Sequence, residues 1–205
     1  MALTVENLSR QIEADLDWRH EELAIFREIL TLDTVTAVRR ASLFRGAWAL
    51  LYAHYEGFCK YALQLLADFM REFPNCTGLS HSTFLFLHEK RMKAARALPT
   101  AEAYEFFRTT IDGLKAEPPP QITIETANNL WPSTLDELLN CMDLNTYSVI
   151  EQRDKIKTLV ARRNDIAHGQ KVFIKDLAYY LEYEDATRNL MYALALAIVD
   201  RAGKY

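Results

Sequence analysis

Glycine and proline are scarce in this chain, since 205 residues contain only six of each. These two residues supply most tight turns, so a sandwich or barrel with many turns is disfavoured. Leucine, alanine, glutamate, arginine and lysine are abundant instead, and they favour helices. Half of the residues are hydrophobic, which suffices for a sizeable core. We therefore expect an all-α fold and a single domain over residues 1–205.

Long hydrophobic runs are also missing, because no uninterrupted apolar stretch approaches about 18 residues. The start, Met1 to Glu6, does not show a basic region followed by an apolar one, as a secretory signal would. We expect a cytoplasmic protein with no membrane partner. The three cysteines, Cys59, Cys76 and Cys141, form no CxxC pair, which predicts free thiols and no zinc framework.

Sequence signatures of other enzyme classes are absent too. The histidines show no His-x3-His spacing, and the chain has no glycine-rich phosphate loop, no Walker lysine motif and no Gly-x-Ser-x-Gly elbow. We therefore expect neither a metal nor an organic cofactor.

Hydrophobic residues recur every three or four positions in several stretches, which is typical of amphipathic helices. This spacing predicts helices over residues 6–30, 43–73 and 176–201, and a less regular one over 84–98. Three aromatic residues of the second stretch are expected in the core: Trp48, Tyr55 and Phe58.

Residues 74–132 follow no clear period, and we interpret them as an irregular insertion within the domain. Three consecutive prolines at 118–120 require extended backbone. Residues 122–126 alternate apolar and polar side chains, and this segment could form a short strand or hairpin.

Two serines resemble helix N-caps because each precedes an acidic residue by three positions. Ser133 predicts a short helix through about residue 142, and Ser148 predicts one that ends near Ile166. Gly169 lies where the end of that helix needs a left-handed residue.

Charge is distributed unevenly along the chain. The formal net charge is -4, but residues 153–175 contain seven basic and two acidic side chains and so carry +5. Phosphate binding draws on lysine and arginine, so this stretch is the best candidate for a nucleic-acid contact.

Within the basic stretch, residues 159–169 read Leu-Val-Ala-Arg-Arg-Asn-Asp-Ile-Ala-His-Gly, with four residues between Arg163 and His168. This segment resembles the Arg-x4-His signature of the HEPN superfamily. Residues 51–60, Leu-Tyr-Ala-His-Tyr-Glu-Gly-Phe-Cys-Lys, are similar to an aromatic-Glu-Gly-aromatic segment of a bacterial HEPN-like nuclease branch. A third similarity is Thr-Ala-Asn-Asn-Leu at residues 126–130.

The resemblance implies a helical bundle of the HEPN type that acts as a metal-independent endoribonuclease. Such domains usually form homodimers, which bring two Arg/His pairs to one cleft. We expect RNA as the substrate and a role as the effector of a bacterial toxin–antitoxin or anti-phage defence system, with a cognate antitoxin or defence partner. One departure is Gln170, which stands where toxins silenced by nucleotidylation carry tyrosine.

The chemistry of RNA cleavage gives the two motif residues separate roles. His168 would transfer protons to or from the ribose oxygens, because histidine titrates near neutrality. Arg163 would hold the phosphate through paired hydrogen bonds, and a bend after the helix could let both side chains converge. Asn164 and Asp165 are supporting residues, although Asp165 could equally serve the turn. Further candidates for RNA contact are Arg162, Lys155, Lys171, Lys60 and Glu56.

Simpler interpretations remain open for the same residues. His168 could only cap the helix end, and the lysines could be a solvated face. The protein would then be a non-catalytic HEPN module that binds RNA or a nucleotide, or one that only mediates dimerisation, because a fold does not guarantee activity.

Overall fold

The computed structural model describes residues 4–32, 36–72, 79–116, 119–126, 128–145 and 147–204. Every regular element in these ranges is a helix, so the expected all-α fold is confirmed. In chain order the helices are α1 (Val5–Thr31), α2 (Ala37–Arg71), α3 (His81–Leu87), α4 (Glu89–Arg96), α5 (Thr100–Ala116), α6 (Pro132–Cys141), α7 (Tyr147–Ala167) and α8 (Leu177–Ala202).

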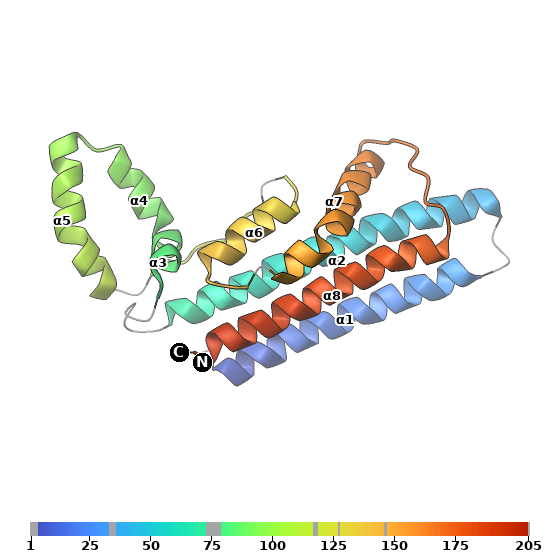
Figure 1. The fold of residues 1–205 in the computed structure, drawn as a ribbon, viewed down its shortest axis with the longest axis horizontal. Helices are drawn as coiled ribbons and strands as arrows, with labels where there is room; N and C mark the ends of the chain where they lie inside the picture. The colour runs from blue at the N-terminus through green and yellow to red at the C-terminus, as the bar shows by residue number, and fades with distance from the viewer. Residues whose placement is uncertain are drawn as a thin grey trace.

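Three long helices, α1, α2 and α8, lie side by side and form the main layer of the molecule (Figure 1). Helix α7 packs against α2 and α8, and α6 packs against α7. The two ends of the chain lie together at one end of the layer (Figure 1). This arrangement lets each helix bury one apolar stripe against its neighbours.

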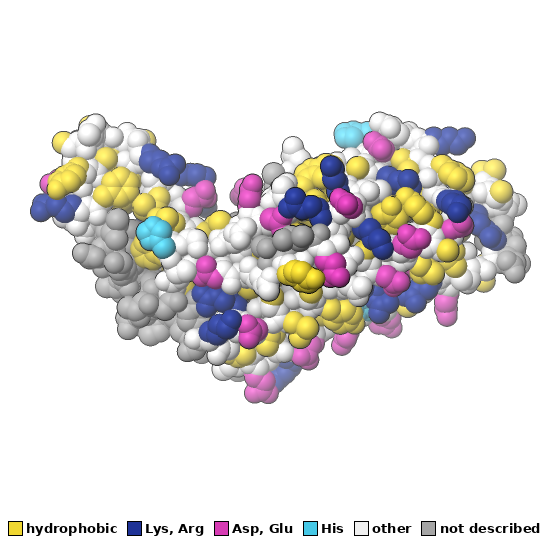
Figure 2. All heavy atoms as spheres, viewed as in Figure 1, with side chains coloured by type: hydrophobic (Ala, Val, Ile, Leu, Met, Phe, Trp, Pro, Cys, Tyr) yellow, Lys and Arg dark blue, Asp and Glu magenta, His cyan; other side chains and the backbone are white. Residues whose placement is uncertain are grey.

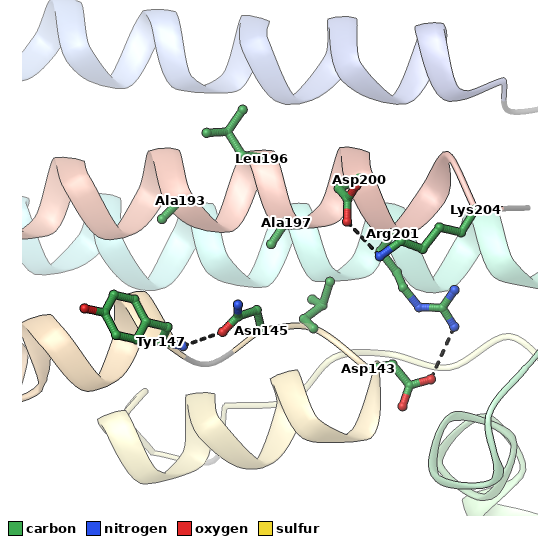
Figure 3. Close-up of a pocket in the computed structure, with 10 residues that line it drawn as sticks. Asp143, Asn145, Tyr147, Ala193, Leu196, Ala197, Asp200, Arg201 and Lys204 are labelled. Atoms are coloured by element: carbon green, nitrogen blue, oxygen red, sulfur yellow. Dashed lines mark hydrogen bonds and ion pairs between the residues drawn. The ribbon is translucent and has the colours of Figure 1, made fainter.

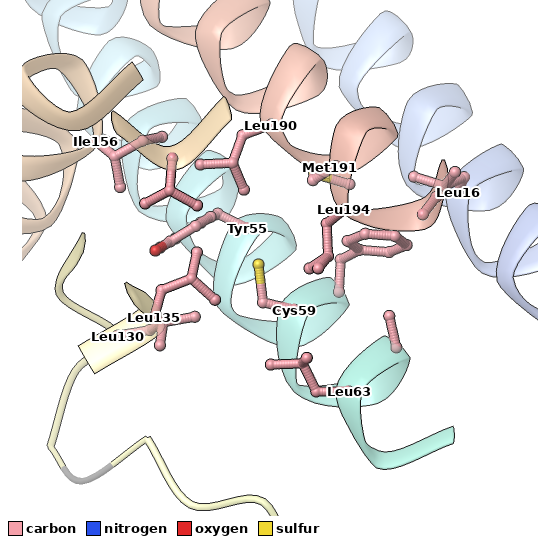
Figure 4. Close-up of a cluster of buried hydrophobic side chains, with 14 of the residues drawn as sticks. Leu16, Tyr55, Cys59, Leu63, Leu130, Leu135, Ile156, Leu190, Met191 and Leu194 are labelled. Carbon is pink, nitrogen blue, oxygen red and sulfur yellow. The ribbon is translucent and has the colours of Figure 1, made fainter. Parts of the chain in front are cut away.

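The core lies between these helices and draws on almost all of them. Figure 4 shows Tyr55 and Cys59 of α2 facing Leu190 and Leu194 of α8, with Leu16 of α1 nearby. The predicted core residues Trp48, Tyr55 and Phe58 are fully buried, as expected from their spacing. Burial of one such side chain contributes about 1.5–3 kcal/mol.

Helices α1 and α8 match the predicted ranges closely, whereas α2 begins several residues earlier than predicted. The hydroxyl of Thr36 accepts a hydrogen bond from the Arg39 amide at 3.4 Å and caps α2. The first turns of α2 are mostly exposed, so they lack the apolar period that would have revealed them.

The single helix predicted over residues 84–98 is wrong, because the chain forms α3 and α4 with a break at His88. His88 is buried and its ring lies 4.5 Å from that of Phe84. The sequence pattern does not predict α5 at all. Among residues 100–109, whose burial the structure describes, the half-buried positions Ala103, Phe106 and Phe107 cover too short a stretch to stand out.

Both predicted serine N-caps are wrong. Helix α6 begins at Pro132 with Trp131 as the flanking residue, and proline suits a first helical position because it has no amide to satisfy. Helix α7 begins at Tyr147, one residue before Ser148. The Tyr147 amide donates to the Asn145 side chain at 2.8 Å, so an asparagine side chain accepts from the first amide of the helix.

Helices α3, α4 and α5 form an arm that stands away from the main layer (Figure 1). Asp143 ties its base to the bundle, because its carboxylate accepts from Ser82 at 3.2 Å, from Thr83 at 3.0 Å and from Arg201 at 3.3 Å. Burial raises the pKa of Asp143, but hydrogen bonds from Ser80 and the other hydroxyls outweigh it and hold that pKa below its usual value. That residues 74–132 are an insertion stays a prediction.

The strand expected over residues 122–126 does not form, although the backbone is extended there. The Gln64 side chain on α2 takes the place of a neighbouring strand. Its amide donates to the Ile122 carbonyl at 3.0 Å and its oxygen accepts from the Ile124 amide at 2.9 Å. The alternating pattern is therefore real, with Ile124 buried, but a side chain supplies the pairing.

The described helices include none that is both long enough and apolar enough to cross a membrane.

Candidate functional site

Helix α7 ends in a tight bend that the sequence predicts at Gly169. The Gly169 amide donates to the Ile166 carbonyl at 3.0 Å, and the Gln170 amide donates to the Asp165 carbonyl at 2.8 Å. Gly169 has a φ of 78°, a conformation that costs residues with a side chain. These features define a Schellman motif, so the predicted left-handed glycine is confirmed.

Arg163 lies one turn before this bend, and its guanidinium is fixed by groups from three parts of the chain. Nη1 donates to the Asn129 side chain at 2.8 Å and to the Asn164 side chain at 3.1 Å. The guanidinium carbon lies 4.3 Å from the ring centre of Tyr52, which is within range of a cation–π interaction. Among the described residues, no hydrogen bond engages Nη2 of Arg163, so that edge remains available to an anion.

Tyr52 supports Arg163 from α2. Its hydroxyl accepts from the Leu130 amide at 3.0 Å and lies 3.4 Å from the Asn129 oxygen. Burial raises the pKa of Tyr52 to about 12, with the Glu56 carboxylate adding to the rise, whereas the Leu130 amide and Arg163 oppose it. The ring below the guanidinium is therefore neutral at physiological pH.

Glu56 lies one turn after Tyr52 and is engaged within the protein. Its carboxylate accepts from the Thr126 hydroxyl at 2.7 Å, which fixes the chain just before Asn129. A larger residue would be crowded at the neighbouring Gly57, because a Cβ there would lie 2.9 Å from a guanidinium nitrogen of buried Arg19. Glu56 therefore fixes Thr126, and Gly57 leaves room for Arg19 of α1.

The three stretches that carry the family resemblance meet at this point. Tyr52 and Glu56 come from residues 51–60, Asn129 from residues 126–130, and Arg163 from residues 159–169. We call Tyr52, Asn129, Arg163 and Asn164 the Arg163 network. Reasoning from sequence missed Asn129 and Tyr52 as members, although both lie in the stretches that resemble the family.

His168 occupies a different environment, because it lies exposed at the end of α7. Its amide donates to the Asn164 carbonyl at 2.9 Å, and no described residue forms a hydrogen bond or ion pair with its imidazole. Five helical positions place Arg163 and His168 about 140° apart around the axis. No hydrogen bond joins the two side chains among the described residues, and their convergence and catalytic roles stay predictions.

The two supporting residues behave differently from each other. The Asn164 side chain contacts the Arg163 guanidinium and can orient it. Asp165 accepts the Gln170 amide through its backbone carbonyl, which any residue could do, and the role of its side chain stays a prediction.

The candidates for RNA contact divide into exposed and engaged side chains. Lys155, Lys171 and Lys60 are exposed. Arg162 packs its guanidinium 5.4 Å from the Trp48 ring centre and 5.0 Å from that of Tyr179, and it donates to the Phe173 carbonyl at 3.3 Å. Arg162 thus holds the connection between α7 and α8, and Glu56 is engaged as described above. Whether any of these residues contacts RNA stays a prediction.

The surface around α7 is rich in basic side chains. Figure 2 shows lysine and arginine side chains over α7 and the connection to α8, with hydrophobic side chains between them, whereas acidic side chains are frequent along α1. The exposed residues Lys155, Lys171 and Lys175 of the basic stretch contribute to this surface, on which acidic side chains are also present.

Other kinds of site lie elsewhere or are not found. A hollow of about 510 Å³ lies between residues 143–147 and the last turns of α8, where Figure 3 shows Tyr147, Leu196 and Lys204 around it. None of the residues of the Arg-x4-His motif lines it. In the part of the chain that the structure describes, no three His, Cys, Asp or Glu side chains are grouped to hold a metal ion.

Comparison with known proteins gives a match that concerns the family of the chain. A family model described as MAE_28990-like HEPN matches residues 8–205. Neither the comparison with curated proteins nor that with solved structures gave a match. HEPN domains are often ribonucleases, so the family supports a nuclease or an RNA-binding module at this coarse level. Because the match spans nearly the whole chain and includes the three stretches that meet at Arg163, this protein belongs to the HEPN family.

Proposed function

We propose that this protein is a metal-independent endoribonuclease that cleaves RNA at a composite site in a homodimer. The observation that carries the proposal is the Arg163 guanidinium, which is held by Tyr52, Asn129 and Asn164 with Nη2 still available, close in the chain to an exposed histidine. A preorganised guanidinium of this kind suits a phosphate that gains charge in the transition state.

The proposed reaction needs only water and groups that the chain contains. One histidine takes the proton from the ribose 2′-hydroxyl, and that oxygen attacks the adjacent phosphorus. The bond from phosphorus to the 5′-oxygen breaks, and that oxygen receives a proton from a second acid. The products are a cyclic phosphate and a 5′-hydroxyl. Arg163 of one subunit neutralises the phosphate oxygens during the displacement, His168 of the other subunit accepts the 2′-hydroxyl proton, and water serves as the second acid.

The angular separation of Arg163 and His168 around the axis of α7 supports a dimeric site. Because no described hydrogen bond joins Arg163 and His168 in one chain, a partner subunit offers a route by which an arginine and a histidine can face the same phosphate. Two basic surfaces of this kind would attract RNA between them.

The central experiment measures cleavage of total cellular RNA by purified protein in EDTA. We expect wild type to cleave, and we expect His168→Ala and Arg163→Ala to leave the RNA intact while circular dichroism shows the same helical content. Lys204→Ala, on an exposed residue at the end of α8, is the matched control and should cleave as wild type does. If wild type leaves RNA intact in EDTA but cleaves it with Mg²⁺, the metal-independent mechanism is wrong.

Mixing two inactive proteins tests the composite site. If each site takes Arg163 from one subunit and His168 from the other, equal amounts of Arg163→Ala and His168→Ala subunits should exchange and recover about a quarter of the wild-type activity. If each site is formed within one subunit, the mixture will stay inactive. A mass measurement in solution shows in parallel whether the dimer exists.

The second candidate is a non-catalytic HEPN module that binds RNA or a nucleotide, or one that only dimerises. The exposed, unengaged imidazole of His168 favours it, because a catalytic histidine is often oriented by a neighbour. Such a binding module would lose affinity in Arg163→Ala but would never cleave, whereas a purely dimerising domain would show little affinity for RNA.

We further propose that the nuclease is the effector of a bacterial toxin–antitoxin or anti-phage defence system and has a cognate antitoxin or defence partner. Induced expression should then arrest bacterial growth, and His168→Ala should not. Growth at the wild-type rate with a soluble, nuclease-active protein would contradict the toxin role but leave the ribonuclease proposal intact.

A further inference from the structure

The connection between α7 and α8 carries an unusual arrangement of side chains directly after the motif. Residues 171–175 read Lys-Val-Phe-Ile-Lys and alternate strictly between inside and outside. Val172 and Ile174 pack against the core, whereas Lys171, Phe173 and Lys175 face solvent. Phe173 is 75% exposed, although an apolar ring gains free energy by burial. An aromatic ring held in water between two lysines requires an explanation.

The segment is fixed rather than loosely tethered. Arg162 donates to the Phe173 carbonyl at 3.3 Å, while its guanidinium packs near the rings of Trp48 and Tyr179. Ile174 is 5% exposed and anchors the segment from below. Figure 1 shows that this connection leaves the end of α7, where His168 lies, and leads back to the start of α8. The exposed ring is therefore presented by an ordered backbone close to the motif.

We propose that Lys171, Phe173 and Lys175 form a platform on which an unpaired RNA base stacks. An aromatic face accepts any base, and lysines on either side can each meet a phosphate. Lys171 and Lys175 lie four positions apart and so at most about 14 Å from each other, a range that accommodates one unstacked nucleotide with its flanking phosphates. We call these three residues the stacking platform. It rests on the proposed function and specifies single-stranded or looped RNA as the substrate.

Charge distinguishes this ligand from a second copy of the chain. A two-fold contact centred on Phe173 would place its lysines against those of the partner, and like charges at a contact are unfavourable. The acidic neighbour Asp176 lies 3.7 Å from the Lys175 amine, but its carboxylate already caps α8 by accepting from the Tyr179 amide at 2.8 Å. RNA phosphates complement the platform better than another basic surface does.

The experiment measures binding of a labelled single-stranded RNA of about 12 nucleotides by fluorescence anisotropy in EDTA. All variants carry His168→Ala as the common background so that the probe stays intact. Phe173→Ala should lower the affinity about tenfold or more, Phe173→Leu should do the same, and Phe173→Trp should retain it. Tyr104→Ala is the matched control, because this tyrosine on α5 is 64% exposed and far along the chain from the motif.

Two further readouts separate stacking from general loss of binding. The Phe173→Trp protein should lose tryptophan emission when the RNA binds, and duplex RNA of the same sequence should bind Phe173→Ala as well as it binds the background protein. Replacing both Lys171 and Lys175 by glutamine should reduce the salt dependence of binding by a slope of about 1.4.

Failure of the platform can be told apart from failure of the nuclease proposal. If the background protein binds the RNA and Phe173→Ala binds it equally well, the platform is wrong while the nuclease can stand. If Phe173→Ala instead converts a dimer to a monomer, the ring belongs to an interface between copies, and the platform is again overturned. If wild type neither cleaves nor binds RNA, both proposals fall together.

Discussion

Arg163 and His168 lie only five residues apart, yet their environments are opposite. Arg163 is half-buried and held by Tyr52, Asn129 and Asn164, so its guanidinium has one position before any ligand arrives. The side chains of His168 and of the stacking platform are exposed, so a ligand or a second subunit can contact them. If the proposed mechanism holds, the group that binds the phosphate is held in place before binding, whereas the group that transfers the proton is completed by what binds.

The difference has a physical origin in the elements that carry the two residues. Arg163 is inside α7, where the helix faces α2 and the 126–130 segment, so its neighbours are set by packing. His168 lies at the Schellman bend, beyond which the chain faces solvent. A positively charged group needs partners when it is partly buried, and an imidazole at a helix end does not.

The largest effect should come from replacing the planar guanidinium of Arg163. Arg163→Lys keeps the charge but loses the paired hydrogen bonds and the stacking on Tyr52, so RNA cleavage should fall about 100-fold or more with unchanged helical content. Arg153→Lys, on the same helix but outside the network, is the control and should cleave normally. Equal activity of the two variants would show that the geometry of the guanidinium is unimportant.

A smaller but sharper effect should follow from placing a carboxylate on the guanidinium. Asn129→Asp would pair with Arg163 and compete with a phosphate, so we expect RNA affinity and cleavage to fall about tenfold while stability is kept. Asn128→Asp adds the same charge at the adjacent exposed position and should change little. A similar loss in both variants would point to net charge rather than to the network.

A single methyl group at Gly169, in the bend at the end of α7, should change the stability of the protein. Gly169→Ala forces a left-handed conformation on alanine and should lower the free energy of unfolding by about 1 kcal/mol, or about 2–4 °C in Tm. Gly46→Ala is the contrasting control, because this glycine lies inside α2 and a Cβ there would meet no atom within 4 Å. This substitution should raise the free energy of unfolding by about 0.5–1 kcal/mol. Calorimetry of the two variants should therefore give shifts of opposite sign.

The smallest effect concerns the pH range over which the network persists. The pKa of Tyr52 is raised to about 12 in the folded protein and is near 10 in an unfolded chain. Its contribution to stability is therefore complete below pH 10 and is lost as the pH rises toward 12. Urea unfolding at about pH 9 and about pH 11 should show a steeper loss for wild type than for Tyr52→Phe. Parallel losses would mean that Tyr52 does not titrate in this way.

Several parts of the fold follow from local sequence alone. Helices α1 and α8 are recognisable because their apolar residues keep a helical period from end to end, and Gly169 is recognisable because a helix end needs a left-handed residue. The break at His88, the hydrogen bond of the Tyr147 amide to Asn145 and the pairing of residues 122–124 with Gln64 are not recognisable. Gln64 lies 60 positions before Ile124, so no local pattern names it, whereas the contacts of His88 with Phe84 and of Tyr147 with Asn145 are local but match neither an apolar period nor a serine cap.

The sequence by itself determined the all-helical class, the core aromatic residues of α2 and the Arg-x4-His motif at the end of a helix, because these depend on composition, period and spacing. Only the tertiary structure decided that Tyr52 and Asn129 hold Arg163, that Arg162 fixes the connection to α8, and that His168 and Phe173 remain exposed. The contacts of Arg163 with Asn129 and Tyr52 join residues 34 and 111 positions apart, and long-range packing rather than local preference brings them together.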